Sequence, residues 1–401
     1  MRDRKREAIS LHLGDDRYAR LRMIPWWNQE RLRQARVVVV GAGALGNEII
    51  KNLALVGVGS ILIVDFDRVE ETNLSRSVLY RHEDSGRPKA RTAARAAKQI
   101  GPDCSVFALE ADVTKHVGDG VYRWADVVIC GLDSREARLA VNRACWRVNT
   151  PWVDGATESL QGIARVFVPP EGPCYECTLS EQDERLMAAR NSCGFLAEQA
   201  YRQGRAPTTP TAAAVVAGVQ VQEALKLLHP DSGLAGLAGK GFFFDGGGCD
   251  WFTVEYVRRR DCLSHETYDI VVETGLESST ATLRDVLREA RDHLGADAVI
   301  DLPSDLATTL RCSHCNQAEE IYALLRCVGA EEARCGVCGE LRVPDVTAEC
   351  RDSSVFVDRT LAELRFGIME ILGARSADNE IAIEISGDRK RVFGGCVERP
   401  T

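Results

Sequence analysis

The sequence predicts an α/β fold in which a mainly parallel sheet has helices on both faces and is followed by a smaller C-terminal α+β region. From Arg36 the chain reads RVVVV, GAGALG, NEIIKNLALVGVG and SILIVDFD, which is an apolar run, a glycine turn, a helix-period segment and a second apolar run. This order is typical of a βαβ unit. A similar alternation continues through the next hundred residues, and the composition changes near His265, where we expect a second region to begin.

The elements after the first βαβ unit follow in the same way. We expect a helix from about Lys89 to Gln99, a strand near Val106, a strand at 126–130, a helix from Arg135 to Val148 and extended segments around Val153 and Val166. These strands are continuous apolar runs, as in parallel sheets that are covered on both faces.

The segment from Thr178 to Pro207 is polar and irregular. Loops of this length are uncommon in compact domains and usually have a function or lack order. Thr209 and Pro210 then offer an N-cap and a first-turn proline for a long helix, TAAAVVAGVQVQEALKLL. A glycine cluster at 246–248 precedes the strand-like segment FTVEYV.

The organisation that we predict is an N-terminal arm over residues 1–35, an α/β domain over 36–265 with its irregular loop at 178–210, and a C-terminal α+β domain over 266–401. Two C-terminal segments have apolar residues at helical spacing. The first contains Leu283, Val286, Leu287, Ala290 and Leu294, and the second, expected as a final helix, contains Leu361, Leu364, Ile368 and Leu372.

Composition excludes some functions. The 401 residues carry a formal net charge of −9, which disfavours binding to nucleic-acid backbones. The first 36 residues have ten Lys and Arg against five Asp and Glu, so the positive charge is concentrated in the arm. We expect no membrane span and no signal peptide, and therefore a cytoplasmic protein. Fifteen cysteines in that compartment suggest metal ligands, nucleophiles or core residues rather than disulfides.

Three glycines, Gly41, Gly43 and Gly46, follow a strand and open a helix, where backbone N–H groups can meet a phosphate. Asp65 ends the next strand and could accept ribose hydroxyls. These four residues alone favour a Rossmann-like dinucleotide site and a dehydrogenase. The continuation DFDRVEETNLSR, GRPKA and VVICGLDSREAR adds residues that hydride transfer does not need: Asn73, Arg76, Lys89 and Asp133.

This ordered set resembles the ubiquitin-activating and molybdopterin-synthase adenylyltransferase (ThiF-type) superfamily over about residues 17–265. The resemblance implies that the three glycines and Asp65 contact adenosine, that Asn73, Arg76 and Lys89 bind the triphosphate of ATP, and that Asp133 binds Mg²⁺. Asp67 is also expected among the cofactor-binding residues. Fixed cations and a hard metal suit attack on the α-phosphorus, because negative charge accumulates there.

The segment DDRYARLRMIPWWNQERLRQARVVVVG resembles the leading arm of the same superfamily. By that resemblance Arg20 reaches the nucleotide of the opposite subunit, which implies a homodimer. Trp26 and Trp27 depart from the family pattern, in which a small polar turn is expected.

Two sets of cysteines have the spacing of zinc ligands. Cys174 and Cys177 pair with Cys262 and His265, and the resemblance implies a structural zinc here, usually held by four cysteines. A second set, Cys312, Cys315, Cys335 and Cys338, predicts a zinc ribbon at about 310–345, in which His314 or Cys327 could replace a ligand. Buried or clustered thiols without a metal are the alternative for both sets.

Cys193 lies in the irregular loop, where the ubiquitin-activating branch has its nucleophile. A thiolate is the reactive form of cysteine, and Arg190 and a solvated loop would favour it. From residue chemistry alone, a buried free thiol is the alternative.

The resemblance implies an ATP-dependent activating enzyme that adenylates the C-terminal carboxylate of a ubiquitin-like protein. Cys193 would then take the acyl group as a thioester and pass it to a conjugating enzyme. One alternative is an adenylyltransferase for a sulfur-carrier protein without a thioester step, although no rhodanese-like module is recognisable. Another is a catalytically silent subunit, against which the retention of Arg76, Lys89 and Asp133 argues. The implied cofactors are ATP, Mg²⁺ and two Zn²⁺ ions.

Overall fold

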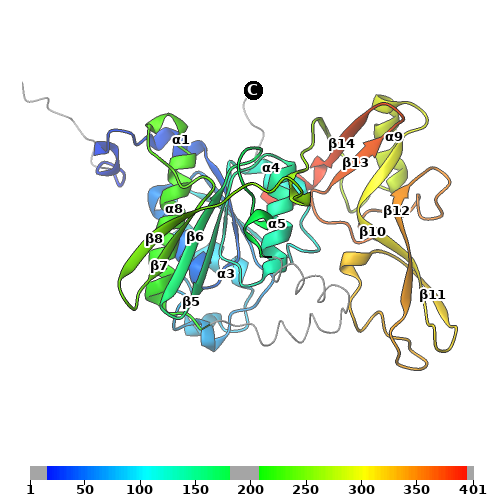
Figure 1. Ribbon diagram of the computed structural model, residues 1–401, viewed down its shortest axis with the longest axis horizontal. Coiled ribbons are helices and arrows are strands. Elements are labelled where there is room, and N and C mark those ends of the chain that lie inside the picture. Colours follow the sequence, from blue (N-terminus) through cyan, green and yellow to red (C-terminus); the bar gives the residue numbers. More distant parts are fainter. Residues whose placement is uncertain (1–15, 181–206, 395–401) are drawn as a thin grey trace, which may run out of the picture.

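The computed structural model describes residues 16–180 and 207–394, which form two sheets with their helices (Figure 1). The larger sheet has eight strands in the order β3-β2-β1-β4-β5-β6-β7-β8. Its strands are β1 (Arg36–Val40), β2 (Ser60–Val64), β3 (Ser105–Leu109), β4 (Val127–Cys130), β5 (Trp152–Glu158), β6 (Gln161–Phe167), β7 (Lys240–Asp245) and β8 (Asp250–Glu255). Strands β1 to β5 pair in parallel, as predicted, and β6 to β8 continue the sheet as antiparallel neighbours.

Helices cover both faces of this sheet because alternate strand residues point to opposite sides. Val37 and Val39 of β1 pack with α2 (Ala44–Val56), α3 (Lys89–Ile100) and α8 (Pro210–Leu227). Their neighbours Val38 and Val40 pack on the other side with α4 (Asp119–Trp124) and α5 (Arg135–Arg147). The short α1 (Gln29–Gln34) precedes β1. The prediction of a mainly parallel sheet covered on both faces is therefore confirmed.

Helix α8 also tests the expectation that no segment suits a membrane. Over Pro210–Leu228 it is the one described helix that is long and apolar enough, by length and composition, to cross a bilayer. However, 56% of this window is buried inside the protein, and α8 packs against α2, β5 and β6 as a core helix. Thr209 caps it by accepting a hydrogen bond from the Ala212 N–H, and Pro210 occupies its first turn, as predicted.

The second sheet belongs to the C-terminal part of the chain and has the order β11-β10-β13-β14-β9, with β12 also paired to β10. Its strands are β9 (Val271–Thr274), β10 (Val299–Arg311), β11 (Ala318–Leu324), β12 (Val343–Cys350), β13 (Ile371–Arg375) and β14 (Glu380–Ile385). Helix α9 (Leu283–Leu294) packs on it through the predicted apolar face, of which Leu283, Val286, Leu287 and Ala290 are fully buried.

The predicted final helix was wrong. Residues 361–365 form a turn, and the chain then enters strand β13 at Ile371. Arg365 has φ of 62° and Met369 has φ of 56°, and neither value allows a continuing right-handed helix. Leu361, Leu364 and Leu372 are nonetheless buried in one core, which explains why their spacing resembled a helix.

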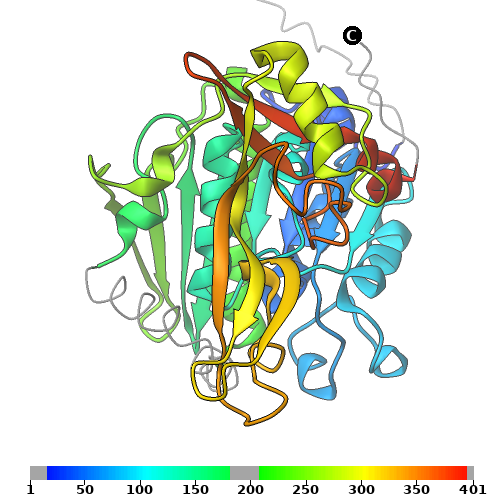
Figure 2. The ribbon, with the colours of Figure 1, turned by 90° about the vertical axis from the view of Figure 1, so that its right-hand side faces the viewer.

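The C-terminal sheet packs against the α4 side of the larger sheet, and Figure 2 views the molecule from that side. Backbone hydrogen bonds join the two: the Gly118 N–H donates to the Ile368 carbonyl at 2.9 Å and the Gly120 N–H donates to the Met369 carbonyl at 2.9 Å. Helix α10 (Arg389–Phe393) adds Phe393, whose ring stacks on Trp124 with centroids 4.3 Å apart. Strands β10 to β12 extend beyond this contact as a long ribbon (Figure 1).

Candidate functional site

Several of the predicted nucleotide residues lie at or just after the carboxyl ends of the central parallel strands. The order β2-β1-β4 places the β1–α2 turn beside the ends of β2 and β4, at the point where the chain reverses its direction of winding. Ligands in open α/β sheets bind at this switch point. The turn carries the three glycines, β2 ends at Asp65, and β4 leads to Asp133.

Two of the three glycines are required by close approach within the protein. A Cβ on Gly46 would lie 1.9 Å from the Gly41 carbonyl oxygen, and a Cβ on Gly41, which has φ of +89°, would lie 2.5 Å from the Gly131 oxygen. Gly43, the N-cap of α2, has no heavy atom within 4 Å of an added Cβ. The protein itself therefore does not require glycine at position 43, and the space beside it is open to a ligand.

Asp65 lies directly behind the glycine turn. Its carboxylate accepts hydrogen bonds from the Ala42 N–H and from the Asp67 N–H, both at 2.7 Å. Burial raises the pKa of the Asp65 carboxyl, while Lys89 and these amides act in the opposite direction. Asp65 thus orders the turn in addition to any contact that it makes with a ribose.

Lys89, at the start of α3, is buried and lies next to Asp67. Its ammonium group is 2.8 Å from the Asp67 carboxylate, and its backbone N–H donates to the Asp67 carbonyl at 2.9 Å. The Asp67 carboxylate therefore holds the lysine in place. A bound phosphate would interact with the same ammonium group.

Asn73 and Arg76 come from the turn around the 3₁₀ helix η2 (Glu71–Asn73). The Asn73 side chain is buried and accepts a hydrogen bond from the Glu70 N–H at 3.0 Å. The half-buried Arg76 donates to the Thr72 carbonyl at 2.5 Å. Asn73 therefore orders the turn that presents the Arg76 guanidinium.

Asp133 is exposed on the loop between β4 and α5. Arg138, on the first turns of α5 and almost fully buried, holds this loop by donating to the Leu132 carbonyl and, at 3.2 Å, to the Gly155 carbonyl. Its Nε donates to Asp154 at 2.9 Å. Although burial alone would raise the pKa of Asp154, the guanidinium groups of Arg138 and Arg165 lower it. The buried ion pair therefore remains charged beneath the loop.

Several residues that organise the site were missed by sequence reasoning. The Asn47 amide donates to the Ala42 and Gly43 carbonyls and accepts from the Leu79 N–H, which ties the glycine turn to the Arg76 segment. The Tyr80 hydroxyl also donates to the Ala42 carbonyl, at 2.6 Å. Gln220 of α8 donates to the Cys130 carbonyl at 2.7 Å. The bonded partners are distant from one another in sequence. The sequence offered one sign of such contacts, which is that Asn47 and Gln220 are polar residues within mostly apolar helix faces.

Arg20 lies elsewhere in the same chain. It is exposed at the N-cap of η1 (Leu21–Met23), close to Tyr18, which packs against Gly57 at the C-terminal end of α2. Arg17 similarly donates to the Ile100 carbonyl at the end of α3. These helix ends lie at the opposite edge of the sheet from the glycine turn, so one chain does not bring Arg20 to its own nucleotide residues.

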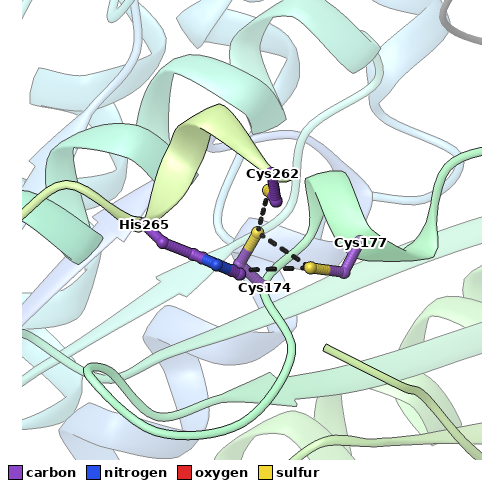
Figure 3. A group of neighbouring side chains, drawn as sticks. All are labelled: Cys174, Cys177, Cys262 and His265. Atoms are coloured by element: carbon purple, nitrogen blue, oxygen red, sulfur yellow. Dashed lines mark hydrogen bonds between the residues drawn. The ribbon is translucent and has the colours of Figure 1, made fainter. Parts of the chain in front are cut away.

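The first set of predicted metal ligands comes together between η4 (Glu176–Thr178) and η6 (Leu263–His265) (Figure 3). The Cys174 sulfur is 3.7 Å from the Cys177 sulfur and 3.5 Å from the Cys262 sulfur, and the Cys177 sulfur is 3.4 Å from the His265 Nε2. The four donor atoms lie within 4.8 Å of one another. Three sulfurs and an imidazole at this spacing could hold a tetrahedral zinc ion.

The second set is also assembled, in the C-terminal ribbon. The donor atoms of Cys312, Cys315, Cys335 and Cys338 lie within 4.8 Å of one another. His314 is exposed, and the Cys327 sulfur instead contacts the carbonyls of Lys115 and Arg365. Neither belongs to the cluster, so the alternative ligands considered from the sequence are not used.

Cys193, the predicted nucleophile, lies outside the described residues, and so does Arg190. Among the described cysteines, Cys249 is exposed, whereas Cys104, Cys130 and Cys145 are buried. Burial raises the pKa of each of these three thiols, which keeps them in the unreactive protonated form.

Known proteins resemble this chain in sequence. The SAMP-activating enzyme E1 of Haloferax volcanii is 39% identical over 235 residues, which cover 58% of this chain and 81% of that protein. The sulfur carrier protein ThiS adenylyltransferase of Escherichia coli K12 is 31% identical over 236 residues, which cover 58% of this chain and 87% of that protein.

Solved structures resemble it in fold. A crystal structure of E. coli MccB with MccA-N7isoASN has a TM-score of 0.52 at 21% identity and covers 64% of this chain and 76% of that chain. The ThiF family matches residues 16–264, which is more than half of the chain and contains all of the predicted nucleotide residues. The protein therefore belongs to the ThiF family and is an ATP-dependent adenylyltransferase.

Proposed function

We propose that the protein uses ATP to activate the C-terminal carboxylate of a ubiquitin-like protein. The observation that carries this proposal is the position of the glycine turn, Asp65 and the Asp133 loop at or just after the ends of adjacent parallel strands, with Lys89 held beside Asp67. The names of relatives support the substrate class, since one is a SAMP-activating enzyme E1 and another a NEDD8-activating enzyme E1 catalytic subunit from Caenorhabditis elegans, 38% identical over 174 residues.

In the reaction that we propose, a carboxylate oxygen of the partner attacks the α-phosphorus of ATP. The bond from that phosphorus to the bridging oxygen breaks, pyrophosphate leaves with the electron pair, and an acyl-adenylate remains. Arg76 and Lys89 supply fixed positive charge to the phosphate oxygens, where negative charge grows. Asp67, which holds Lys89 at 2.8 Å, keeps the ammonium in place before ATP binds.

The site also fits a magnesium ion. Mg²⁺ is usually held by one or two carboxylates together with substrate phosphates and water, and Asp133 presents one exposed carboxylate on a loop fixed from below. The ion would supply a hard positive charge beside the phosphates. Arg138 and Asp154 would keep the loop in position for it.

The cluster of Cys174, Cys177, Cys262 and His265 fits a structural zinc ion. Its two halves come from segments on either side of α8 and β8, so the ion would fasten the end of the sheet to the segment before residue 181. The Arg259 N–H lies 3.4 Å from the Cys177 sulfur and supports a thiolate there. This zinc would serve folding rather than chemistry.

We propose further that the Cys193 thiolate attacks the acyl carbon of the adenylate. The bond to AMP breaks, AMP leaves, and a thioester remains for transfer to a conjugating enzyme. We also propose a cytoplasmic homodimer in which Arg20 reaches the nucleotide of the partner subunit, because within one chain Arg20 lies at the far edge of the sheet.

Sulfur-carrier adenylation without a thioester is the second candidate. The relative from E. coli that carries this name matches the chain over 87% of its own length. The chemistry up to the acyl-adenylate is the same, so the two candidates differ at Cys193.

The experiment combines two assays on the purified full-length protein. With ATP, Mg²⁺ and a candidate ubiquitin-like protein, we expect partner-dependent exchange of pyrophosphate into ATP. We expect Lys89→Ala to lower that exchange about 100-fold or more, the usual cost of removing a group that stabilises transition-state charge. Absence of exchange with every candidate partner would instead indicate a catalytically silent subunit.

The second assay detects a thiol-labile adduct between the protein and its partner. We expect Cys193→Ala to remove the adduct while pyrophosphate exchange continues. Cys249→Ala is the matched control, because Cys249 is an exposed thiol outside the proposed site and its loss should leave the adduct intact. Exchange without any adduct in the parent protein would favour the sulfur-carrier candidate.

A further inference from the structure

The ribbon formed by β10, β11 and β12 ends in a cluster of four sulfurs. Cys312 and Cys315 follow β10, and Cys335 and Cys338 precede β12. The Cys312 sulfur is 3.4 Å from that of Cys338, and the Cys315 sulfur is 3.5 Å from that of Cys335 and 3.8 Å from that of Cys338. Two segments that are twenty residues apart in sequence therefore direct all four thiols at one point.

These separations suit a metal ion better than disulfides. Bonds of about 2.3 Å from a tetrahedral zinc ion to four sulfurs place the sulfurs about 3.8 Å apart. A disulfide would instead bring two sulfurs to about 2.05 Å and leave the other pair unrelated to it.

Both halves of the cluster have the same backbone form. The Cys312 N–H donates to the Gln317 carbonyl and the Asn316 N–H donates to the Cys312 carbonyl, at 2.8 and 2.9 Å. In the other half, the Cys335 N–H donates to the Glu340 carbonyl and the Gly339 N–H donates to the Cys335 carbonyl, again at 2.8 and 2.9 Å. Each half is thus a tight knuckle closed by two matching hydrogen bonds.

The residue after each second cysteine completes the knuckle. Asn316 has φ of 58° and Gly339 has φ of 76°, and asparagine and glycine are the residues that best tolerate this left-handed conformation. The backbone N–H groups of His314 and Cys315 lie against the Cys312 sulfur, and those of Val337 and Cys338 lie against the Cys335 sulfur. Each knuckle therefore directs two backbone donors at the sulfur of its first cysteine.

The apolar core of the described C-terminal residues ends before the tip of the ribbon. The apolar core of the C-terminal part includes Leu306 and Leu324 but does not reach the knuckles, and Val337 and Val343 are exposed. Ion pairs also stabilise the segments near the tip. Arg342 pairs with Glu319, and Arg365 pairs with Glu332 on the segment that leads to the second knuckle.

We propose that Cys312, Cys315, Cys335 and Cys338 bind one Zn²⁺ ion as four thiolates in a closed tetrahedral site. Soft sulfur donors and the absence of an open coordination position suit structural zinc. The ion closes the end of the ribbon in place of an apolar core. This site is separate from the cluster at Cys174 and does not depend on the proposed function.

The first test measures metal bound to the purified full-length protein. Replacing one cysteine in each knuckle, Cys312→Ser with Cys335→Ser, should remove one equivalent of zinc per chain relative to the parent. The matched control is His314→Ala with Cys327→Ser, which changes the neighbouring donors outside the cluster and should remove none. An unchanged metal content in the double-knuckle variant would overturn the proposal.

The second test uses the parent protein and does not rely on a variant that folds. Hydrogen exchange should show that amides in residues 312–342 lose protection when a chelator withdraws zinc, and regain it when zinc alone is restored. Peptides from β1 and β2 serve as the internal reference. Unchanged exchange at 312–342, or a disulfide between Cys312 and Cys338 in protein purified under reducing conditions, would contradict a zinc site.

Discussion

Arg138 donates a hydrogen bond to the backbone carbonyl of Leu132, the residue immediately before Asp133. A buried side chain on α5 therefore fixes the exposed loop that carries Asp133, the proposed Mg²⁺ ligand. The same guanidinium bonds to Asp154 and to the Gly155 carbonyl, so the loop is tied to strand β5.

This relationship predicts a defect that depends on metal. Arg138→Lys keeps a positive charge beside Asp154 but loses the forked donor that reaches two carbonyls. We expect the Mg²⁺ concentration for half-maximal pyrophosphate exchange to rise about tenfold, the equivalent of about 1.4 kcal/mol, or one hydrogen bond to a charged group. Arg143→Lys, on the same helix but facing Glu176, is the control and should leave the Mg²⁺ requirement unchanged. Equal Mg²⁺ curves for Arg138→Lys and the parent would refute this role.

The glycine turn predicts a separation of folding from binding. Gly46→Ala forces a Cβ within 1.9 Å of the Gly41 oxygen and should lower the free energy of unfolding by about 1–3 kcal/mol. Gly43→Ala meets no protein atom, so its stability should stay within about 1 kcal/mol of the parent while its affinity for ATP falls. Thermal unfolding and calorimetric titration with ATP measure the two effects. Full ATP affinity in Gly43→Ala would mean that the nucleotide does not occupy the space beside this residue.

The contact between the two sheets, where the Gly120 N–H bonds to the Met369 carbonyl, predicts that a larger side chain at Gly120 would be destabilising. A Cβ on Gly120 would lie 2.6 Å from the Met369 carbonyl oxygen, the acceptor of the Gly120 N–H. Gly120→Ala should therefore weaken the attachment of the C-terminal part, and proteolysis between the two parts should become faster. Gly336→Ala is a suitable control, because nothing lies within 4 Å of a Cβ there. Equal proteolysis rates for parent and Gly120→Ala would contradict a tight contact there.

A pH dependence follows from Glu273 on β9. Hydrogen bonds from Arg389 and Arg123, against the effect of burial, lower the pKa of Glu273 from 4.5 to about 2. Because the folded-state pKa is the lower one, the contribution of this carboxylate to stability is complete above about pH 4.5 and is lost as the pH falls toward 2. The melting temperature of Glu273→Gln should therefore lie below that of the parent by a constant small amount from pH 7 to 5. The gap should narrow at lower pH, and a gap that widens there would contradict the assignment.

Local sequence patterns predicted most of the α/β part. The run from Arg36 to Val64 folds as the βαβ unit that its periodicity indicates, and Thr209 with Pro210 starts α8. The prediction of a final helix was wrong because a turn buries the same apolar residues. In that turn Arg365 has a positive φ, and nothing in the sequence indicates this conformation.

The candidate site was predictable only in part. Motif residues such as Gly41 and Lys89 could be predicted because the resemblance places them in order along the chain. The bonds from Arg138 to the Leu132 loop and from Asn47 to the Leu79 N–H could not be found, because such contacts depend on how the helices pack. Similarly, only the structure separates Cys327 from the sulfur cluster that it neighbours in sequence.

Met369 and Phe393 are buried against the α4 face of the larger sheet, together with Trp124. A chain ending at His265 would leave that aromatic surface in water and would leave the Gly118 and Gly120 amides without their carbonyl acceptors. We therefore expect a protein shortened to its ThiF-matched portion to aggregate. The activity measured on such a fragment would be lower than that of the full-length protein.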